Sequence, residues 1–583
     1  MCGIFLLLNN GLGMGQTVFS KGFIEDAFER GSRRGPESSK LIHPTSQVTA
    51  GFHRLAINGL DDISMQPIWI NNKMLICNGE IYNYKKLYEQ LGVVPTTNSD
   101  CEIILHLYER VGIDQTIRML DGVFAFAIYD ADLNKIFVAR DPYGVRPLYC
   151  WKGMNNIFIF ASELKVISPF QDIKTRERLM RLEELPQYQE ELQEQTEVTQ
   201  FKPGHYQIIS FHKMFKKPRN EIIQYHTLST FSSYLKPISL HENIVYHLNN
   251  AVMKRCLATE RPIACLLSGG LDSSLIAALV NNFYSLSFDK KIKLETYSIG
   301  LADSEDLKYA RIVADHLGTN HTEIVMTEDD FFKAIPYVIE AIESYDTTTV
   351  RASIGNYLLG KYISQHSEAK VIFNGDGSDE LCGGYLYMHK CPNPIEFDKE
   401  TKRLLNDIYM YDVLRSDKCI SSHGLEPRTP FLDKSFVQFY LSIPTADRFH
   451  PLDNQCEKYL LRSSFETMYH PDSEKPFLPE NILWRTKEAF SDGVSGHGRS
   501  LYHILQEKIS QIEGIQADYS RECNKYTHLP PKTLEQYYYR RLFDGFYPNN
   551  EKVIPYFWMP KYMDTNDPSA RTLTNLYNAK MNI

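Results

Sequence analysis

Residues 262–274 read PIACLLSGGLDSS, and this stretch decides the fold of the second half of the chain. The apolar run from Pro262 to Leu267 predicts a strand, and an apolar helix is predicted to follow the Ser- and Gly-rich turn. Backbone N–H groups at a helix N-terminus favour phosphate binding. Because no Lys follows the glycines, the general P-loop pattern is excluded, and the turn indicates a phosphate site of another kind.

Beyond this stretch, strands and helices alternate along the chain. Apolar strands are predicted at 294–299 and 370–374, and helices at 273–283, 304–317 and 352–364. Such alternation is typical of a parallel, doubly wound α/β sheet. After residue 400 the hydrophobic period is mostly helical, so we expect a helical C-terminal part after the sheet.

The first two hundred residues have a different pattern. Short β-rich runs lie at 74–81, 123–130, 135–141 and 157–163, and helical patterns lie at 20–31 and 101–112. The turn from Asp130 to Asn134 joins two of the runs as a hairpin. This half is therefore predicted to be an α+β layered domain, and we divide the chain into domains of residues 1–215 and 216–583.

Composition places the chain among ordinary globular proteins. Of its 583 residues, 43% are hydrophobic and 23% are charged, and the formal net charge is -9. A mildly acidic chain without a dense Lys/Arg stripe repels a phosphate backbone, so we expect no nucleic-acid partner. The longest apolar runs, such as 4–8 and 263–267, are far too short for a membrane span, so no membrane partner is expected either.

The eleven cysteines are scattered singly, without CxxC pairs or the spacing of a disulfide framework. We expect most of them to be buried free thiols in a reducing compartment. No signal-peptide pattern opens the sequence. The predicted localisation is therefore cytoplasmic.

Residues 171–200 differ in composition from the rest of the chain. They are rich in Glu, Gln and Arg and nearly without aromatic residues. Such a composition is typical of a surface helix or of a mobile loop, and the sequence does not decide between the two.

Cys2 follows Met1 directly. If Met1 is removed, one residue carries both a thiol and a free α-amine, and an amine with a pKa of about 8 can act as general base for that thiol. Taken alone, a Cys at position 2 is more often chance than chemistry. The surrounding motifs therefore decide its interpretation.

The first half of the chain resembles the class II glutamine amidotransferases, because six motifs appear in the order typical of that family. They are MCGIF at 1–5, RGPE at 34–37, FHRLAI at 52–57, NGEIYN at 78–83, SDCE at 99–102 and RDPYGVRPLY at 140–149. The resemblance implies an N-terminal-nucleophile layered sandwich in which Cys2 attacks the amide of glutamine. In isolation, NGEIYN would indicate only a turn at the end of a strand.

The resemblance also implies a glutamine site. Arg54 would pair with the substrate carboxylate, because a planar guanidinium binds a carboxylate bidentately, and Glu80 with Asp100 would receive the α-ammonium. The Asn78 side chain and the Gly79 N–H would stabilise the oxyanion. The full glutamine-binding set is Arg54, Leu55, Ala56, Ile57, Asn58, Asn78, Gly79, Glu80 and Asp100. The family commonly has His and Asp where this chain has Arg33 and Glu37, and we assign no role to either residue.

The turn SGGLDSS looks like the pyrophosphate-binding PP-loop of enzymes that split ATP into AMP and pyrophosphate. With further motifs it is similar to the glutamine-hydrolysing asparagine synthetase family, over nearly the whole chain except 171–200. These motifs are TYSIG at 296–300, DSED at 303–306, ESYDTTTVRAS at 343–353, FNGDGSDE at 373–380, GGYLYMH at 383–389, EPRTPFLD at 426–433, EK at 457–458 and WRTKEAFSDG at 484–493. The implied fold of this half is an α/β doubly wound parallel sheet of the PP-loop ATP pyrophosphatase type.

The same resemblance implies an ATP site and a metal site. The expected ATP-binding residues are Leu267, Ser268, Gly269, Gly270, Asp272, Ser273, Ile299, Asn374 and Gly375. Asp272 would repel a polyphosphate unless a cation intervened, so Mg²⁺ is expected on Asp272 and Asp379. Lys458 would neutralise charge on the phosphates, and Asp376 would take part in forming or consuming an acyl adenylate.

The implied reaction converts aspartate, ATP and glutamine to asparagine, AMP, pyrophosphate and glutamate. Two alternatives stay open: a relative that adenylates another acid, such as a β-lactam synthetase or an amidotransferase with a different acceptor, and a non-enzymatic storage or scaffolding protein of the same fold. The motif residues Cys2, Arg54 and Asp100 argue against a β-lactam synthetase, which needs no external ammonia. The expected partners are the small-molecule substrates, and a homodimer is a possible assembly that the sequence does not decide.

One departure from the family pattern concerns Asp376. Where the family usually reads Ser-Gly-Glu-Gly, this chain reads Asn374-Gly-Asp376-Gly, so the acidic side chain is one methylene shorter. Either the backbone restores the reach of the carboxylate, or the chain is a slow synthetase. We expect the backbone to compensate, because the other synthetase motifs are intact and the charge is kept.

Overall fold

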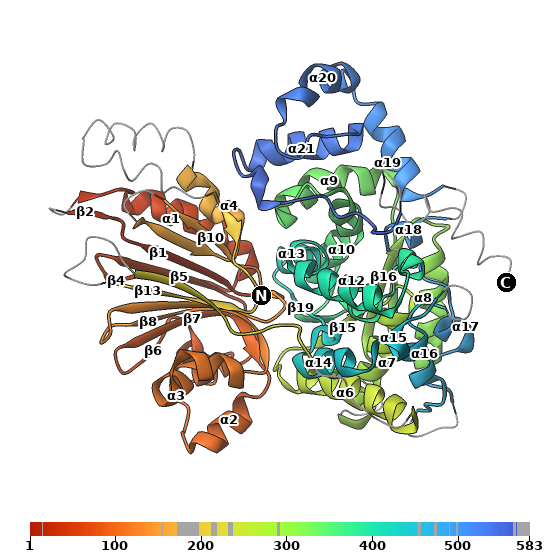
Figure 1. Ribbon diagram of the computed structural model, residues 1–583, viewed down its shortest axis with the longest axis horizontal. Coiled ribbons are helices and arrows are strands. Elements are labelled where there is room, and N and C mark those ends of the chain that lie inside the picture. Colours follow the sequence, from red (N-terminus) through yellow and green to blue (C-terminus); the bar gives the residue numbers. More distant parts are fainter. Residues whose placement is uncertain are drawn as a thin grey trace. The chain divides into compact units, whose positions relative to one another are not determined.

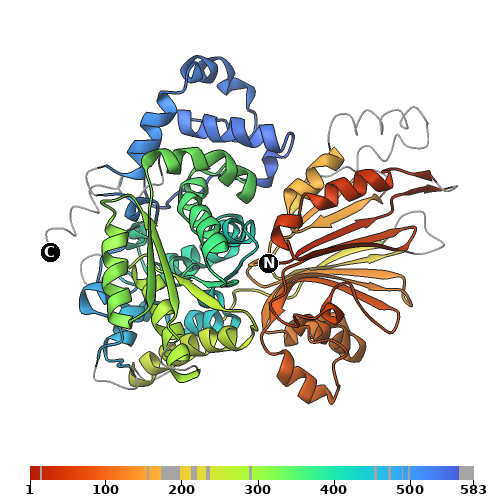
Figure 2. The ribbon, with the colours of Figure 1, turned by 180° about the vertical axis from the view of Figure 1, so that it is seen from behind.

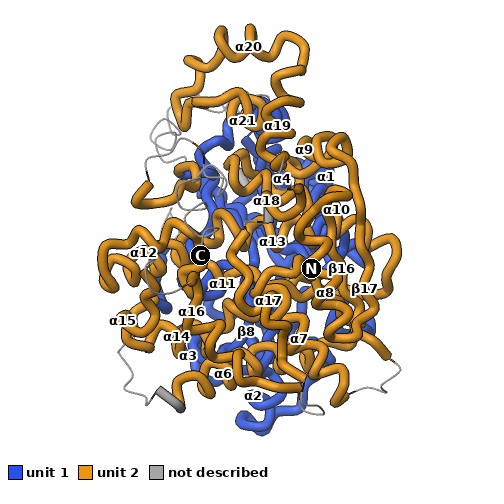
Figure 3. The backbone as a smooth tube through the Cα atoms, turned by 90° about the vertical axis from the view of Figure 1, so that its right-hand side faces the viewer, with its two compact units in different colours: residues 1–227, 421–425, 541–555 blue, residues 228–420, 426–540, 556–583 orange. Residues whose placement is uncertain are grey.

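The computed structural model describes residues 1–13, 16–153, 156–171, 197–211, 219–230, 237–287, 292–451, 456–470, 475–488, 490–496, 499–563 and 567. The chain forms two compact units, coloured separately in Figure 3. The first unit comprises 1–227, 421–425 and 541–555, and the second comprises 228–420, 426–540 and 556–583. The expected boundary between 215 and 216 stays a prediction. Most of segment 171–200 lies outside the described residues.

The first unit is built on two antiparallel sheets. In the first sheet the strand order is β12-β10-β11-β1-β5-β4, and in the second it is β14-β13-β9-β8-β7-β6. Strand β1 spans Gly3–Leu8, β4 Ser38–Thr45, β5 Val48–Arg54, β10 Tyr149–Lys152, β11 Phe158–Ala161 and β12 Thr199–Gln200. Strand β6 spans Ile68–Ile70, β7 Lys73–Ile81, β8 Gly122–Asp130, β9 Lys135–Arg140, β13 His205–Ser210 and β14 Arg219–Gln224, while β2 (Gly11–Gly13) and β3 (Gln16–Thr17) form a small ribbon.

Alternating side chains pack the two sheets face to face. Ile4, Leu6 and Leu8 of β1 point into one apolar core with Met74 and Ile76 of β7. The opposite face of the second sheet forms another core with helices α2 and α3, and helices α1 and α4 lie over the first sheet (Figure 1). Helix α1 spans Lys21–Glu29, α2 Tyr84–Leu91, α3 Ile103–Met119 and α4 Leu164–Ile167. The unit is therefore an α+β layered sandwich.

The second unit contains a parallel sheet of five strands in the order β17-β16-β15-β18-β19. Strand β15 spans Ile263–Leu266, β16 Glu295–Gly300, β17 Asn320–Val325, β18 Val371–Phe373 and β19 Glu426–Arg428. The chain runs outward from β15 to β17 and then returns to the other side of β15. Strand order therefore reverses between β15 and β18, and open α/β sheets bind ligands outside the carboxyl ends of strands at such a switch point.

Helices surround this sheet, and Figure 2 gives the reverse view of their arrangement. Helix α7 packs on β15, α8 on β16 and β17, and α10 on β16 and α9. Their bounds, with those of the other helices of the second half, are α6 Pro237–Leu257, α7 Leu271–Ser287, α8 Glu305–Leu317, α9 Glu328–Ile342, α10 Thr347–His366, α11 Ser378–Cys382, α12 Pro394–Asp407, α13 Asp412–Ser421, α14 Lys434–Ser442, α15 Thr445–Arg448, α16 Tyr459–Glu466, α17 Glu480–Leu483, α18 Phe490–Gly493, α19 Leu501–Ser510, α20 Ile515–Glu522 and α21 Leu534–Phe546.

The fold class expected from the sequence is confirmed. The predicted hairpin at 130–134 joins β8 and β9, and the three predicted α/β strands are β15, β16 and β18. The mostly helical part after residue 400 is also present. All eleven cysteines are free thiols, as the sequence analysis expected. Among the described residues, the structure contains no helix with both the length and the apolar character of a membrane span.

A buried ionic contact joins helices α6 and α14. Asp433 caps α14 by accepting hydrogen bonds from the backbone N–H groups of Ser435 and Phe436. One of its carboxylate oxygens also lies 2.7 Å from Arg255 Nη1 and 2.5 Å from Lys254 Nζ. Burial alone would raise the pKa of Asp433, but the two cations outweigh burial and hold this pKa below its ordinary value.

We expect Asp433→Ala to lower the free energy of unfolding by about 3 to 5 kcal/mol, because it leaves Arg255 buried without its carboxylate. Urea unfolding followed by circular dichroism measures the loss. Since the folded pKa is depressed, the stabilisation is present above about pH 4 and is lost as the pH falls through the folded pKa. The exposed Asp447→Ala is the control, and equal effects of both substitutions would contradict the ionic role.

Candidate functional site

Cys2 lies at the entry to strand β1, where its thiol and backbone are both held. Its Sγ lies 3.5 Å from the carbonyl oxygen of Leu55, and its carbonyl accepts a 2.9 Å hydrogen bond from Arg34 Nε. Arg34 is fully buried and also donates to Ser421 Oγ at 2.9 Å. The Cys2 side chain keeps some exposure, so a rigid backbone presents an accessible thiol.

The predicted glutamine-binding residues lie at the end of β5 and in the turn after it, within β7, and in the short helical turn at Asp100–Glu102 of the first unit. Asn58 Nδ2 donates to Glu80 Oε2 at 2.6 Å, and the Ile81 N–H donates to Asp100 Oδ2 at 2.6 Å. Arg54 donates to the carbonyl oxygen of Gly59, which fixes the turn that carries Leu55, Ala56 and Ile57. The turn after β5 thus lies next to Cys2 through Leu55, and the Glu80 carboxylate is joined to the same turn through Asn58.

Glu37, which the sequence analysis left without a role, supports this turn. Its Oε2 accepts a 2.7 Å hydrogen bond from the Ala56 N–H. The only sequence signal for this role was the RGPE motif, which contains Glu37. Glu37 lies near the turn because β4 pairs with β5.

The candidate oxyanion donors lie on strand β7 opposite β1. Asn78 is fully buried, and its Nδ2 is 3.5 Å from Ser162 Oγ, which in turn accepts a hydrogen bond from the Ile4 N–H. Gly79 has no room for a side chain, because a Cβ there would lie 2.4 Å from the Val123 carbonyl oxygen. The close approach of β7 and β8 therefore requires glycine at this position.

In the second unit, the SGGLDSS turn connects β15 to α7 at the switch point. Ser273 Oγ accepts a hydrogen bond from the Ser268 N–H at 3.2 Å, which closes the turn. Gly269 has φ +71°, and a Cβ there would lie 2.4 Å from the Ala310 nitrogen. The turn therefore packs directly on α8, and Ser268, Gly270 and the start of α7 line a cavity of about 200 Å³.

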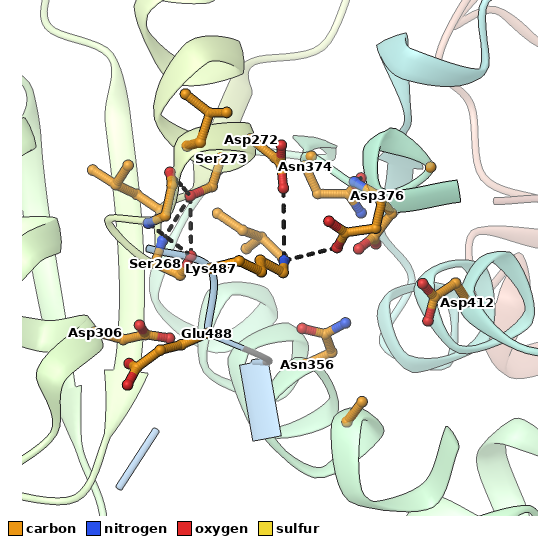
Figure 4. Close-up of a pocket in the computed structure, with 18 of the residues that line it drawn as sticks. Ser268, Asp272, Ser273, Asp306, Asn356, Asn374, Asp376, Asp412, Lys487 and Glu488 are labelled. Atoms are coloured by element: carbon orange, nitrogen blue, oxygen red, sulfur yellow. Dashed lines mark hydrogen bonds and ion pairs between the residues drawn. The ribbon is translucent and has the colours of Figure 1, made fainter. Parts of the chain in front are cut away.

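Two carboxylates and two ammonium groups meet at this cavity. Lys458 Nζ lies 2.6 Å from Asp272 and 2.5 Å from Asp379, and Lys487 Nζ lies 2.7 Å from Asp379 and 3.7 Å from Asp272. Figure 4 shows Lys487 reaching toward Asp272. Burial alone would raise the pKa of Asp272, but the two lysines outweigh it and hold this pKa below its ordinary value. The sequence analysis missed Lys487, although its motif was recognised.

Glu457 links the two lysines. It is fully buried, precedes Lys458, and accepts a 2.6 Å hydrogen bond from the Lys487 N–H. Arg462 also donates to Glu457, at 2.9 Å. This contact fixes two chain segments that are far apart in the sequence around the same pair of carboxylates.

The donor set fits Mg²⁺. Asp272 and Asp379 come from different elements, yet both reach the same ammonium group, so their oxygens also suit one small cation. Mg²⁺ is usually held by one or two carboxylates together with substrate phosphates. Among the described residues, no group of three or more His, Cys, Asp and Glu side chains is placed to hold a metal ion.

Asp376 lies on the cavity wall beside helix α13. Its Oδ1 is 3.2 Å from Arg415, which also binds Asp412 at 2.8 Å. Asn374 Oδ1 accepts a hydrogen bond from the Asp376 N–H at 3.3 Å, and Asn374 Nδ2 donates to Ser416 Oγ at 2.7 Å. Burial raises the pKa of Asp376, and Arg415 opposes that rise. Arg415 and Asp412 lie outside the recognised motifs, so the sequence analysis missed both.

A second acidic group lines the cavity next to Ile299. Arg485 lies 4.0 Å over the Tyr309 ring and bridges Asp306 at 3.2 Å and Glu488 at 3.0 Å. Figure 4 shows the two carboxylates side by side. Burial raises the pKa of Asp306 to about 7; Glu488 adds to the rise and Arg485 opposes it. Asp306, Arg485 and Glu488 stood in recognised motifs without an assigned role, and Tyr309 stood outside them.

The fold and these two sites define a class: a glutamine amidotransferase unit joined to an ATP-using unit of the PP-loop type. The family model described as "Glutamine amidotransferase domain" matches residues 1–219, and the model described as "Asparagine synthase" matches 244–396 and 391–566.

Curated relatives narrow this class. A Gallus gallus protein, "Asparagine synthetase [glutamine-hydrolyzing]", is 40% identical over 99% of this chain and 100% of its own length. The Homo sapiens protein of that name is 39% identical over 94% of this chain and 95% of its own. The chain belongs to the glutamine-hydrolysing asparagine synthetase family.

The raised pKa of Asp306 predicts that ATP binding depends on pH. As the pH rises through about 7, this carboxyl loses its proton and adds a negative charge to the cavity, so we expect ATP to bind about threefold to tenfold more weakly near pH 8 than near pH 6. Asp306→Asn should remove most of this dependence. Calorimetric ATP titrations measure it, with the exposed Asp303→Asn as control. A pH dependence unchanged in Asp306→Asn would contradict the assignment.

Proposed function

We propose that this chain makes asparagine from aspartate, with glutamine as the nitrogen donor and ATP as the activating substrate. The observation that carries the proposal is the convergence of Asp272, Asp379, Lys458 and Lys487 on the SGGLDSS turn. A phosphate-binding turn with opposed acidic and basic groups suits transfer of an AMP group to a carboxylate. The family membership supplies the acceptor, aspartate.

In the first unit, the Cys2 thiol attacks the carboxamide carbon of glutamine once Met1 has been removed. The α-amine of Cys2 takes the thiol proton, and the Asn78 side chain and Gly79 N–H stabilise the oxyanion. Ammonia leaves, and water hydrolyses the thioester to glutamate. Arg54 holds the α-carboxylate of glutamine, and Glu80 with Asp100 holds its α-ammonium; the hydrogen bonds of these carboxylates to Asn58 and Ile81 support that arrangement.

In the second unit, the β-carboxylate of aspartate attacks the α-phosphorus of ATP and displaces pyrophosphate. Lys458 and Lys487 move from the carboxylates to the phosphate oxygens and offset their charge. Asp272 and Asp379 would hold Mg²⁺, which would supply further charge neutralisation on the phosphates. Ammonia then attacks the acyl adenylate and AMP leaves. Ser268, Gly270 and Ser273, which line the cavity, hold phosphates together with the neighbouring Gly269, while Leu267, Ile299, Asn374 and Gly375 border the nucleoside.

Several finer statements belong to the same proposal. We place the division between the domains at 215/216, close to the end of the amidotransferase match at 219. The residue roles above, the Mg²⁺ requirement, a cytoplasmic location and a homodimeric assembly are likewise predictions.

A single incubation distinguishes this function from the alternative functions. With glutamine, aspartate, ATP and Mg²⁺, the proposed enzyme forms AMP and asparagine in equal amounts. An amidotransferase with another acceptor forms no asparagine, and a storage or scaffolding protein forms neither product. Replacing glutamine by ammonium chloride tests the second unit alone.

We expect Cys2→Ala to lower glutamine-dependent asparagine formation by a factor of about 10³ or more, because the nucleophile is lost. Ammonia-dependent formation should stay near that of the unaltered chain. Glutamate and asparagine are quantified by chromatography, with Cys523→Ala as the matched control. Equal loss of both activities in Cys2→Ala would rule out separate sites.

Asp376→Glu tests whether the shorter carboxylate is compensated. The Asn374 and Arg415 contacts hold Asp376 in place, so lengthening the side chain should misplace the carboxylate and slow ammonia-dependent synthesis by roughly tenfold or more. Asp376→Asn should reduce it by about 10²-fold, while glutaminase activity stays unchanged. Faster synthesis by Asp376→Glu would show instead that the short side chain of Asp376 limits the rate of synthesis in the unaltered chain.

A further inference from the structure

One stripe of helix α10 forms a wall of the ATP cavity. Thr348, Ala352, Asn356 and Leu359 line the cavity, and their spacing of four, four and three residues places them on one helix face. Helix α10 packs on β16, so this stripe faces the carboxyl end of that strand. Three of these residues are small or apolar. Asn356 alone brings a carboxamide to the stripe.

The Asn356 side chain lines the cavity without a hydrogen-bond partner among the described residues. The residue is 6% exposed, and within the part of the chain that the structure describes its side chain makes no hydrogen bond. Figure 4 shows its amide end turned toward the cavity. The amide nitrogen and oxygen are not among the fully buried polar atoms, so both keep access to the cavity and can bond a molecule bound there. A bound molecule is the partner that this position suits.

The neighbouring cavity wall suits a flat heterocycle. Leu267, Ile299 and Leu359 offer apolar contacts, and strand β15 ends at Leu266, so one edge of β16 is left open beyond that point. The Leu267 N–H bonds to the Tyr297 carbonyl, which turns the backbone groups of Tyr297 toward β15. Successive residues of a strand point their N–H and C=O groups to opposite sides. Ile299, two residues after Tyr297, therefore presents its N–H and C=O to the same open side.

We propose that Asn356 selects adenine as the base of the nucleotide, by bonding the edge that carries the 6-amino group and N7. This inference rests on the proposed use of ATP, and it adds the residue that distinguishes ATP from other purine nucleotides.

The hydrogen-bonding groups are complementary. A carboxamide has one acceptor, Oδ1, and two donors on Nδ2. Adenine offers a donor at its 6-amino group beside an acceptor at N7, and Asn pairs with both atoms at once. Guanine and hypoxanthine carry a carbonyl at position 6, so Oδ1 would face a second acceptor. The 6-amino group has another hydrogen, which the Ile299 carbonyl is able to accept.

Equilibrium binding tests the proposal without turnover. Mg·ATP and Mg·ITP are titrated into the full chain by calorimetry, with glutamine and aspartate left out. We expect the unaltered chain to prefer ATP, and Asn356→Leu, which keeps the side-chain size, to reduce that preference by about tenfold or more. Asn356→Ala should behave alike, and Gln365→Leu, an exposed amide on the same helix, should leave the preference unchanged.

Other outcomes overturn the assignment. A ratio of ATP to ITP affinities that is unaltered in both Asn356 variants would show that the amide does not distinguish adenine from hypoxanthine. A changed preference for ATP over 2′-deoxy-ATP, with the ATP-to-ITP ratio intact, would place the amide on the ribose instead. Thermal melting of each variant confirms folding. Failure of the proposed function is separate, because it appears as absent AMP and asparagine formation by the unaltered chain.

Discussion

The shared contact of Asp272 and Asp379 with Lys458 and Lys487 is the constraint around which the second unit is organised. Four charges this close inside a cavity are tolerable only as neighbours of opposite sign, because each alone would face a large desolvation penalty. Their positions therefore depend on four separate segments: the start of α7, helix α11, the residue before α16, and the loop that carries Lys487. Glu457 joins two of these segments through the Lys487 N–H, which keeps both lysines in register.

Most of the fold was predictable because the relevant signals are local. The strand and turn at 262–274, the hairpin at 130–134 and the alternation of strands and helices each depend on neighbouring residues. Apart from Gly269, the predicted ATP-binding and metal-binding residues line one cavity of the second unit. Residues such as Arg415 and Asn356 were not predictable as site residues. Their positions follow from how α13 and α10 pack, and an Arg or Asn within a helix carries no signal of the cavity it faces.

The first unit shows how a sheet sandwich positions Cys2, the proposed nucleophile. Cys2 stands one residue before a strand that is buried along its whole length, so its backbone has little freedom while its thiol reaches solvent. Arg34 and Glu37, from one short motif, hold the Cys2 carbonyl and the Ala56 N–H respectively. The RGPE motif therefore stabilises two parts of the site.

The early end of strand β15 has a consequence for the sheet itself. Strand β16 runs to Gly300, whereas β15 stops at Leu266, so β16 has hydrogen-bonding capacity on this side that β15 does not use. A purine seated against Ile299 would occupy the place of the missing strand residues and pair with the backbone much as a neighbouring strand does. The nucleotide would then be a structural element of the sheet, and the β16 edge would become more rigid whenever the base is bound.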